Sequence, residues 1–184
     1  MTRTNAFVFL AVLFLVALVA IAIHFLLRMR KVSNATWDGL LGRLIVVDRT
    51  NLELVALDLV DESGNRREFG ESAIEPDSLW DLIGGMDGLE ALEKNCDVLV
   101  DLAFYVQRWY PEAIVVAEQL RLNAREIQWH VGRLKGAAQT GNLGSSFPLY
   151  AQRAVATYYL MTRHVLELYR QGNLAEFAQL QAVL

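Results

Sequence analysis

The chain has 184 residues, of which 54% are hydrophobic and 21% are charged, and its formal net charge is −4 at pH 7. This composition excludes an intrinsically disordered chain, and roughly 150 residues outside one membrane span suffice for a single domain with its own core. The lone cysteine, Cys96, excludes an internal disulfide. Because acids outnumber bases, we expect no nucleic-acid partner.

Residues 6–27 form an uncharged apolar run, AFVFLAVLFLVALVAIAIHFLL, in which His24 is the one polar side chain. As a helix this run is about 33 Å long, enough to cross the hydrocarbon core of a bilayer. We predict a single transmembrane helix over 6–27, after a short N-terminal tail over 1–5. The alternative is a signal peptide cleaved after Ala20-Ile21-Ala22, but the run continues past these residues into a basic stop, which favours an anchor.

Charges beside the apolar run predict its orientation. Arg28, Arg30 and Lys31 follow it directly in a basic juxtamembrane linker over 28–35, whereas the tail carries one arginine and the terminal amine. The positive-inside rule places the more basic side in the cytoplasm. We therefore expect a single-pass protein of the cell (inner) membrane whose residues 36–184 form a cytoplasmic α-helical domain.

Helical spacing of apolar residues recurs throughout residues 36–184, which predicts an all-α bundle of about six helices, two of them long. Thr36 and Asp48 are suited to cap the first two helices of this domain. The second of these stretches is also rich in valine and leucine, so a short β-hairpin near 43–60 is the alternative there. Residues 61–70 are charged and turn-rich, which is typical of a loop.

Polar residues that can cap helix N-termini recur in the middle of the chain: Ser78 with Asp81, Asp87 with Glu90, and Asn95. The first two pairs match the capping box and predict two short helices, which Gly84-Gly85 separates. Asn95 predicts the start of a further helix over 96–110.

The longest helical pattern runs from Pro111 to about Gln139. One face of it carries apolar residues at alternating spacings of four and three, which is the pattern of a helix-packing seam. The seam residues are Ala117, Leu120, Ala124, Ile127, Val131 and Leu134. Because alanine permits close approach, we expect antiparallel packing against a helix over 149–170, across a turn over 141–148.

The helix over 149–170 is apolar around most of its circumference, which predicts a central position in the bundle. Gly172 is expected to end it, and Asn173 is suited to cap a last short helix.

Four polar residues on the two long helices are candidates to line a pocket between them: Glu126, His130, Arg133 and His164. The spacing Glu-x-x-x-His occurs once and differs from the paired Glu-x-x-His of di-iron bundles, so we predict a surface ion pair of Glu126 with His130 and no metal site. The antiparallel register pairs His130 with Tyr158 or Tyr159. That register leaves His164 too distant to share a metal, and we expect it to be a core or boundary residue.

No catalytic pattern emerges from the rest of the chain. Cys96 is predicted at a helix start, where a thiolate is favoured, but Asp97 and Asp101 oppose the thiolate and no histidine is placed to act as its base. The sequence also lacks a zinc-protease HExxH, a P-loop and a Gly-x-Ser-x-Gly motif. We expect neither an enzyme nor a bound metal or cofactor.

The leading hypothesis is a membrane-anchored helical interaction protein, an adaptor or accessory subunit of a membrane complex, with the lipid bilayer and a protein as its partners. Its candidate contact residues are the tryptophans Trp37, Trp80, Trp109 and Trp129. One alternative is a membrane-tethered enzyme or small-ligand-binding bundle with a pocket between the two long helices. Another is a homo-oligomer that associates through the anchor and the alanine-rich seam.

Overall fold

The computed structural model describes residues 7–20, 23, 36–59 and 74–184, and the chain divides into two compact units, Met1–Thr36 and Trp37–Leu184. In the first unit residues 7–20 are helical. Within the described ranges no helix combines the length and the apolar character needed to cross a bilayer. The predicted span over 6–27 continues into residues outside these ranges, as do the flanking cations Arg28, Arg30 and Lys31 and the predicted loop over 61–70.

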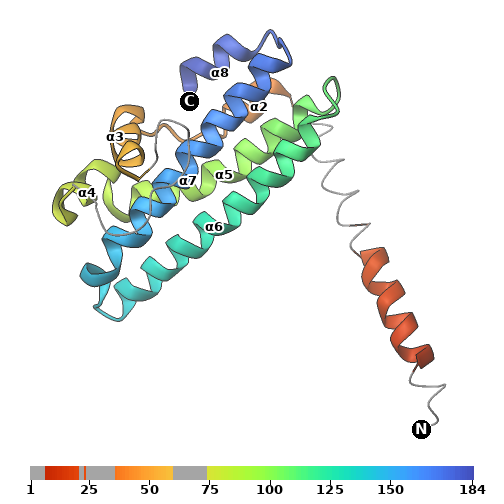
Figure 1. Cartoon of the computed structure of the whole chain (residues 1–184), viewed down its shortest axis with the longest axis horizontal. Coiled ribbons are helices and arrows are strands. Elements are labelled where there is room, and N and C mark those ends of the chain that lie inside the picture. Colours follow the sequence, from red (N-terminus) through yellow and green to blue (C-terminus); the bar gives the residue numbers. More distant parts are fainter. Residues whose placement is uncertain (1–6, 21–22, 24–35, 60–73) are drawn as a thin grey trace. The chain divides into compact units, whose positions relative to one another are not determined.

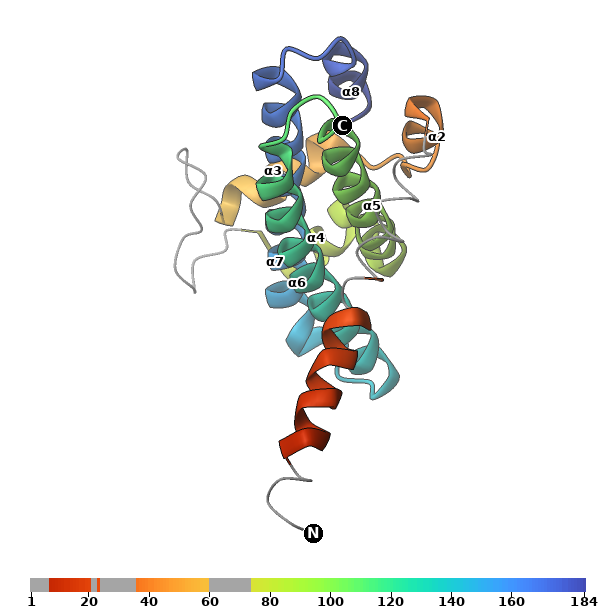
Figure 2. The same ribbon diagram turned by 90° about the vertical axis from the view of Figure 1, so that its right-hand side faces the viewer.

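The second unit is all-helical in its described part, which confirms the prediction of an all-α bundle. Its helices are α2 (Trp37–Leu41), α3 (Arg49–Leu59), α4 (Pro76–Ile83), α5 (Gly85–Val106), α6 (Ala113–Gln139), α7 (Leu143–Gln171) and α8 (Phe177–Val183). The three long helices α5, α6 and α7 run antiparallel in chain order and lie side by side (Figure 1). Turned by 90°, the bundle presents α6 at the front with α7 beside it, and α2 lies near α5 (Figure 2).

α5 is one continuous helix of 22 residues, so the prediction that Asn95 starts a separate helix is wrong. The Asn95 side chain is buried, and its amide pairs with backbone 50 residues earlier in the chain. Its Oδ1 accepts from the Ile45 N–H and its Nδ2 donates to the Ile45 carbonyl, each at 2.8 Å. Nδ2 also lies 3.2 Å from the Tyr158 hydroxyl of α7. Asn95 therefore joins three segments of the unit and has no capping role.

The residues before α3 settle the choice between helix and hairpin. Residues 44–48 have no regular secondary structure and α3 begins at Arg49, so the hairpin alternative is wrong for residues 43–59. The Asp48 carboxylate accepts from the Asn51 N–H at 3.1 Å, which is the predicted cap. Leu52, Val55 and Ala56 are buried at helical spacing, and a strand pairing would have divided them between two faces.

A tight junction joins α4 to α5. α4 begins with Pro76 in its first turn and no side-chain cap, so Ser78 lies inside the helix. Asp87 likewise lies inside α5, whose N-cap position is Gly84, so both capping-box predictions are wrong. Gly84 and Gly85 both have positive φ, at 78° and 63°, and break the chain direction as predicted. Gly88 permits the close approach of the two helices, because an added Cβ would lie 1.8 Å from the Ile83 carbonyl oxygen.

The connection between α6 and α7 is shorter than the predicted turn over 141–148. α7 begins at Leu143, Pro148 lies inside it, and Gly141 adopts a φ of 72° between the helices. Because α7 starts six residues before the predicted 149, the register shifts and His130 faces Tyr150, with ring centroids 5.6 Å apart, in place of Tyr158 or Tyr159.

The last residues of the unit lie beside its first helix. Asn173 has a φ of 48° just after α7, and the N-cap position of α8 is Glu176, so the prediction of Asn173 as the cap is wrong. Trp37 of α2 donates from Nε1 to Oε1 of Gln179 at 2.6 Å, and its ring lies 5.6 Å from that of Tyr169. The two ends of the unit are therefore held together.

Candidate functional site

Part of the polar set predicted to line a pocket between the two long helices belongs to an aromatic cluster. His130 is buried, and Trp129 and Tyr150 flank its ring with centroids at 5.0 and 5.6 Å. Glu126 and His130 are neighbours as predicted, with His130 Nε2 3.5 Å from Glu126 Oε1. The prediction of a surface position is wrong for His130, because its side chain is only 2% exposed. Tyr150 covers it as a result of the early start of α7. Neither ring nitrogen of His130 has a hydrogen-bond partner in the described part of the chain.

The other two candidate residues lie on the surface. Arg133 is exposed, and its guanidinium lies 5.8 Å from the ring centroids of both Trp129 and Tyr150. His164 is also exposed, so its predicted core or boundary position is wrong. About four turns of α7 separate His164 from Tyr150, or roughly 20 Å along the axis. The structure thus brings together Glu126, His130 and Arg133 and leaves His164 apart.

Hollows in the described surface lie against α3. One, of about 200 Å³, is bounded by α3, α7 and the C-terminal Leu184, and another, of about 350 Å³, by α3, α4 and the start of α5. Neither is the expected pocket between α6 and α7. Asp48, Asp81 and Asp87 line the second hollow, yet the described residues contain no cluster of three or more His, Cys, Asp or Glu that could hold a metal ion.

Cys96 lies in the middle of α5 and not at a helix start, contrary to the prediction. Burial raises the pKa of its thiol, and the negative charges of Asp97 and Glu93 raise it further. The thiol therefore stays protonated at neutral pH, which is typical of a packing residue and not of a nucleophile.

The buried face of α6 carries the seam, since Ala117, Leu120, Ala124, Ile127, Val131 and Leu134 are all buried. The opposite face carries a second apolar line that the sequence analysis missed. Val115, Leu122 and Trp129 are 72%, 54% and 55% exposed and are spaced by seven residues, so they lie in one row along the helix. We call the exposed side of the helix that carries this row the outer face of α6; Glu112, Glu118, Arg125, Gly132, Arg133 and Gly136 flank the row. The spacing of seven residues between these apolar residues could have been recognised in the sequence.

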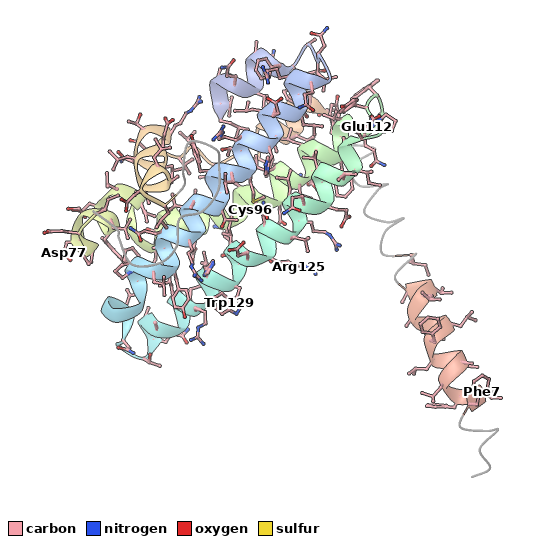
Figure 3. The ribbon with its side chains drawn as sticks, viewed as in Figure 1. Phe7, Asp77, Cys96, Glu112, Arg125 and Trp129 are labelled. Atoms are coloured by element: carbon pink, nitrogen blue, oxygen red, sulfur yellow. The ribbon has the colours of Figure 1, made fainter. Side chains whose placement is uncertain are left out.

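Charges beside the row are only partly ordered by sign along the helix. Glu112 and Glu118 lie toward its N-terminal end, and Arg125 and Arg133 lie toward its C-terminal end. Arg121 and Glu126 interrupt this order, and they contact Glu118 and His130 of the same helix. Figure 3 labels Glu112, Arg125 and Trp129 along this helix. The Glu118 carboxylate pairs with Arg121 at 2.7 Å, while Arg125 has no ion pair with any residue that the structure describes.

Two glycines on the outer face are not required by the packing of the bundle. Gly132 and Gly136 are exposed, and a Cβ added to either would find no atom within 4 Å. Glycine in the interior of a helix costs about 0.5–1 kcal/mol relative to alanine. The packing of this unit therefore does not explain why glycine occupies either position.

The four tryptophans divide by exposure. Trp37 and Trp80 are half-buried, and their rings contact Tyr169 and Phe147 respectively. Trp109 and Trp129 are more than half exposed. Trp129 is therefore the candidate contact residue that belongs to the row of exposed apolar residues on α6.

No protein-family model, curated protein or solved structure matches this chain. The chemistry of its own surfaces is thus the basis for a functional assignment. Of these surfaces, the outer face of α6 combines exposed apolar area, partly ordered charges and glycines without a packing role.

Proposed function

We propose that this chain is a membrane-anchored helical interaction protein, an adaptor or accessory subunit of a membrane complex, that binds its protein partner through the outer face of α6. The observation that carries the proposal is the row of Val115, Leu122 and Trp129. Single exposed apolar residues are ordinary on protein surfaces. A helix that docks another helix presents apolar residues at heptad spacing to its partner, and this row supplies one such residue in each of three successive heptads.

The anchor in this proposal is the apolar run over 6–27. Residues 7–20 of the run are helical, and the side chains of Phe7, Phe9 and Phe14 are at least 66% exposed. Lipid is the solvent that favours such a surface on a helix. The cluster of Arg28, Arg30 and Lys31 supports a cytoplasmic position for residues 37–184.

Membrane attachment is tested by fractionation of the full chain fused at Leu184 to a fluorescent protein. We expect fluorescence inside the cell and a membrane fraction that resists salt and carbonate washing. Phe14→Arg together with Leu15→Arg is expected to release the chain, because each cation near the centre of a span costs about 2.5–3.5 kcal/mol. A wild-type chain that is released by salt, or that begins near Ile23, contradicts the anchor.

Partner binding is tested by purification of the full chain from membranes in mild detergent. We expect Leu122→Glu to reduce recovery of the partner at least about tenfold, because a charge replaces an apolar contact at the centre of the row. Leu54→Glu on α3 is the matched control, since Leu54 is 53% exposed and Leu122 is 54% exposed. The proposal requires a protein that co-purifies with the Leu54→Glu variant but not with the Leu122→Glu variant. If no such protein is found, the proposal fails.

A further inference from the structure

We infer that the partner of the outer face of α6 is the same face of a second copy of this chain, paired antiparallel about a two-fold axis beside Leu122. The inference rests on the proposed function, because it names the partner of the surface described there. Three features of the surface support it: the order of its apolar residues, the order of Glu118 and Arg125, and the position of Gly132.

The apolar row is self-complementary when it is reversed. Val115 and Trp129 lie seven residues before and after Leu122, respectively. In an antiparallel pair centred on Leu122, each Val115 therefore meets Trp129 of the second copy, and the two Leu122 side chains meet each other. A small aliphatic group faces a large indole at both ends of the contact. This is the geometry of an isologous interface, in which the same patch serves both subunits.

Charge order selects the antiparallel direction. Glu118 lies four residues before Leu122, and Arg125 lies three residues after it. Glu118 already pairs with Arg121 of its own chain. Antiparallel pairing places each Glu118 beside Arg125 of the second copy as well, so two further opposite-charge contacts form around the axis. Parallel pairing in register would place Glu118 against Glu118 and Arg125 against Arg125, and like charges repel at such positions. Arg125, which makes no ion pair with the described residues of its own chain, is available for this contact.

The same antiparallel register brings the start of each α6 to the second half of the other. Glu112 precedes Leu122 by ten residues, and Gly132 follows it by ten, so the start of one α6 lies against Gly132 of the other. The absence of a side chain at Gly132 leaves room for the backbone of the second copy to approach. Arg133, next to this glycine, then lies near Glu112 of the second copy. The interface thus supplies a reason for a glycine that the bundle does not need.

The size of the surface predicts a weak pair that the membrane strengthens. One helix face is smaller than the roughly 800 Å² per partner of a standard stable interface. A two-fold axis along the membrane normal allows both anchors to enter one bilayer, and attachment to the same surface raises the effective concentration of each copy for the other. We therefore expect pairing in membranes and little pairing in dilute detergent.

Cysteine cross-linking of the full chain in its membrane tests the register. The native Cys96 is buried and does not interfere. We expect Leu122→Cys to form a disulfide-linked dimer under mild oxidation, and Leu54→Cys, at similar exposure on α3, to stay monomeric. Val115→Cys alone is expected to stay monomeric, because the two copies of residue 115 lie about 20 Å apart in this register. It is expected to cross-link when co-expressed with Trp129→Cys.

Charge reversal tests the pairing of Glu118 with Arg125. In the Leu122→Cys background, we expect Glu118→Arg and Arg125→Glu each to lower the cross-linked fraction about fivefold, and the double variant to restore it. Only a partner that carries the same two changes can be restored in this way. Circular dichroism of each variant confirms that α6 remains folded.

The outcomes separate the second copy from other partners. Absence of a dimer with Leu122→Cys overturns the inference, as does a double variant that is no better than the single ones. If Leu122→Glu removes a different protein from the purification while Leu122→Cys never cross-links to itself, the proposed function stands and the inference fails. If neither effect is seen, both fail.

Discussion

Replacing Gly88 with alanine is expected to destabilise the unit Trp37–Leu184 by about 3 kcal/mol or more. The added Cβ would lie 1.8 Å from the Ile83 carbonyl oxygen and 2.8 Å from its carbonyl carbon, so α4 and α5 have to separate to admit it. In a unit of this size the loss corresponds to a fall in melting temperature of roughly 10 °C. Thermal unfolding of the full chain in mild detergent, followed by circular dichroism, measures it.

Gly132→Ala is the matched control for this prediction. It makes the same chemical change inside a helix, but at a site with no atom within 4 Å of the new Cβ. Because alanine favours the helix, we expect Gly132→Ala to raise the free energy of unfolding by about 0.5–1 kcal/mol at a protein concentration too low for association. Equal melting temperatures for the two variants would contradict the close contact at Gly88.

Asn95→Ala is expected to cost about 3 kcal/mol or more of stability, because three groups lose their hydrogen bonds together. These groups are the N–H and the carbonyl of Ile45 and the hydroxyl of Tyr158, which is only 2% exposed as a residue. The substitution also leaves a cavity between Ile45 and Tyr158. Urea unfolding of the full chain measures the loss, and Asn123→Ala, on the surface of α6, is the control with an expected change below about 0.5 kcal/mol.

Asn95→Asp distinguishes the lost hydrogen bonds from the lost volume. The carboxylate is nearly isosteric with the amide but cannot donate to the Ile45 carbonyl. Burial favours the neutral acid, so the pKa of the new group is higher in the folded than in the unfolded chain. The folded state then binds more protons, and the stability of the variant decreases as pH rises above about 4. A variant whose deficit does not depend on pH would contradict a dry site at residue 95.

Local patterns predicted those parts of the fold that are determined within a few residues. The cap at Asp48 and the break at Gly84-Gly85 depend on neighbouring backbone, and both were predicted correctly. The unbroken course of α5 could not be predicted in this way, because the partner of Asn95 is Ile45, 50 residues distant. An asparagine can cap a helix or bridge buried segments, and only its tertiary contacts show which role it has.

The same limit applies to the candidate site. The early start of α7 depends on the inclusion of Pro148 in the helix, which its local composition disfavours, and this start places Tyr150 over His130. Glu126 and His130 could be paired from their spacing, but the burial of His130 could not be predicted without that register. The outer face of α6 was readable as a period of seven. Its polar neighbours made it less apparent than the alanine-rich seam on the other side of the helix.

The contact of Trp37 with Gln179 joins the first and last helices of the unit across 142 residues of chain. As a result, the polypeptide enters and leaves the unit Trp37–Leu184 at neighbouring points. Such a layout suits circular permutation: a short linker can join the native ends, and the three-residue connection around Gly141 can be opened to make new ones. In a permuted chain of this kind, residues 1–36 would be attached at the opposite end of the long helices.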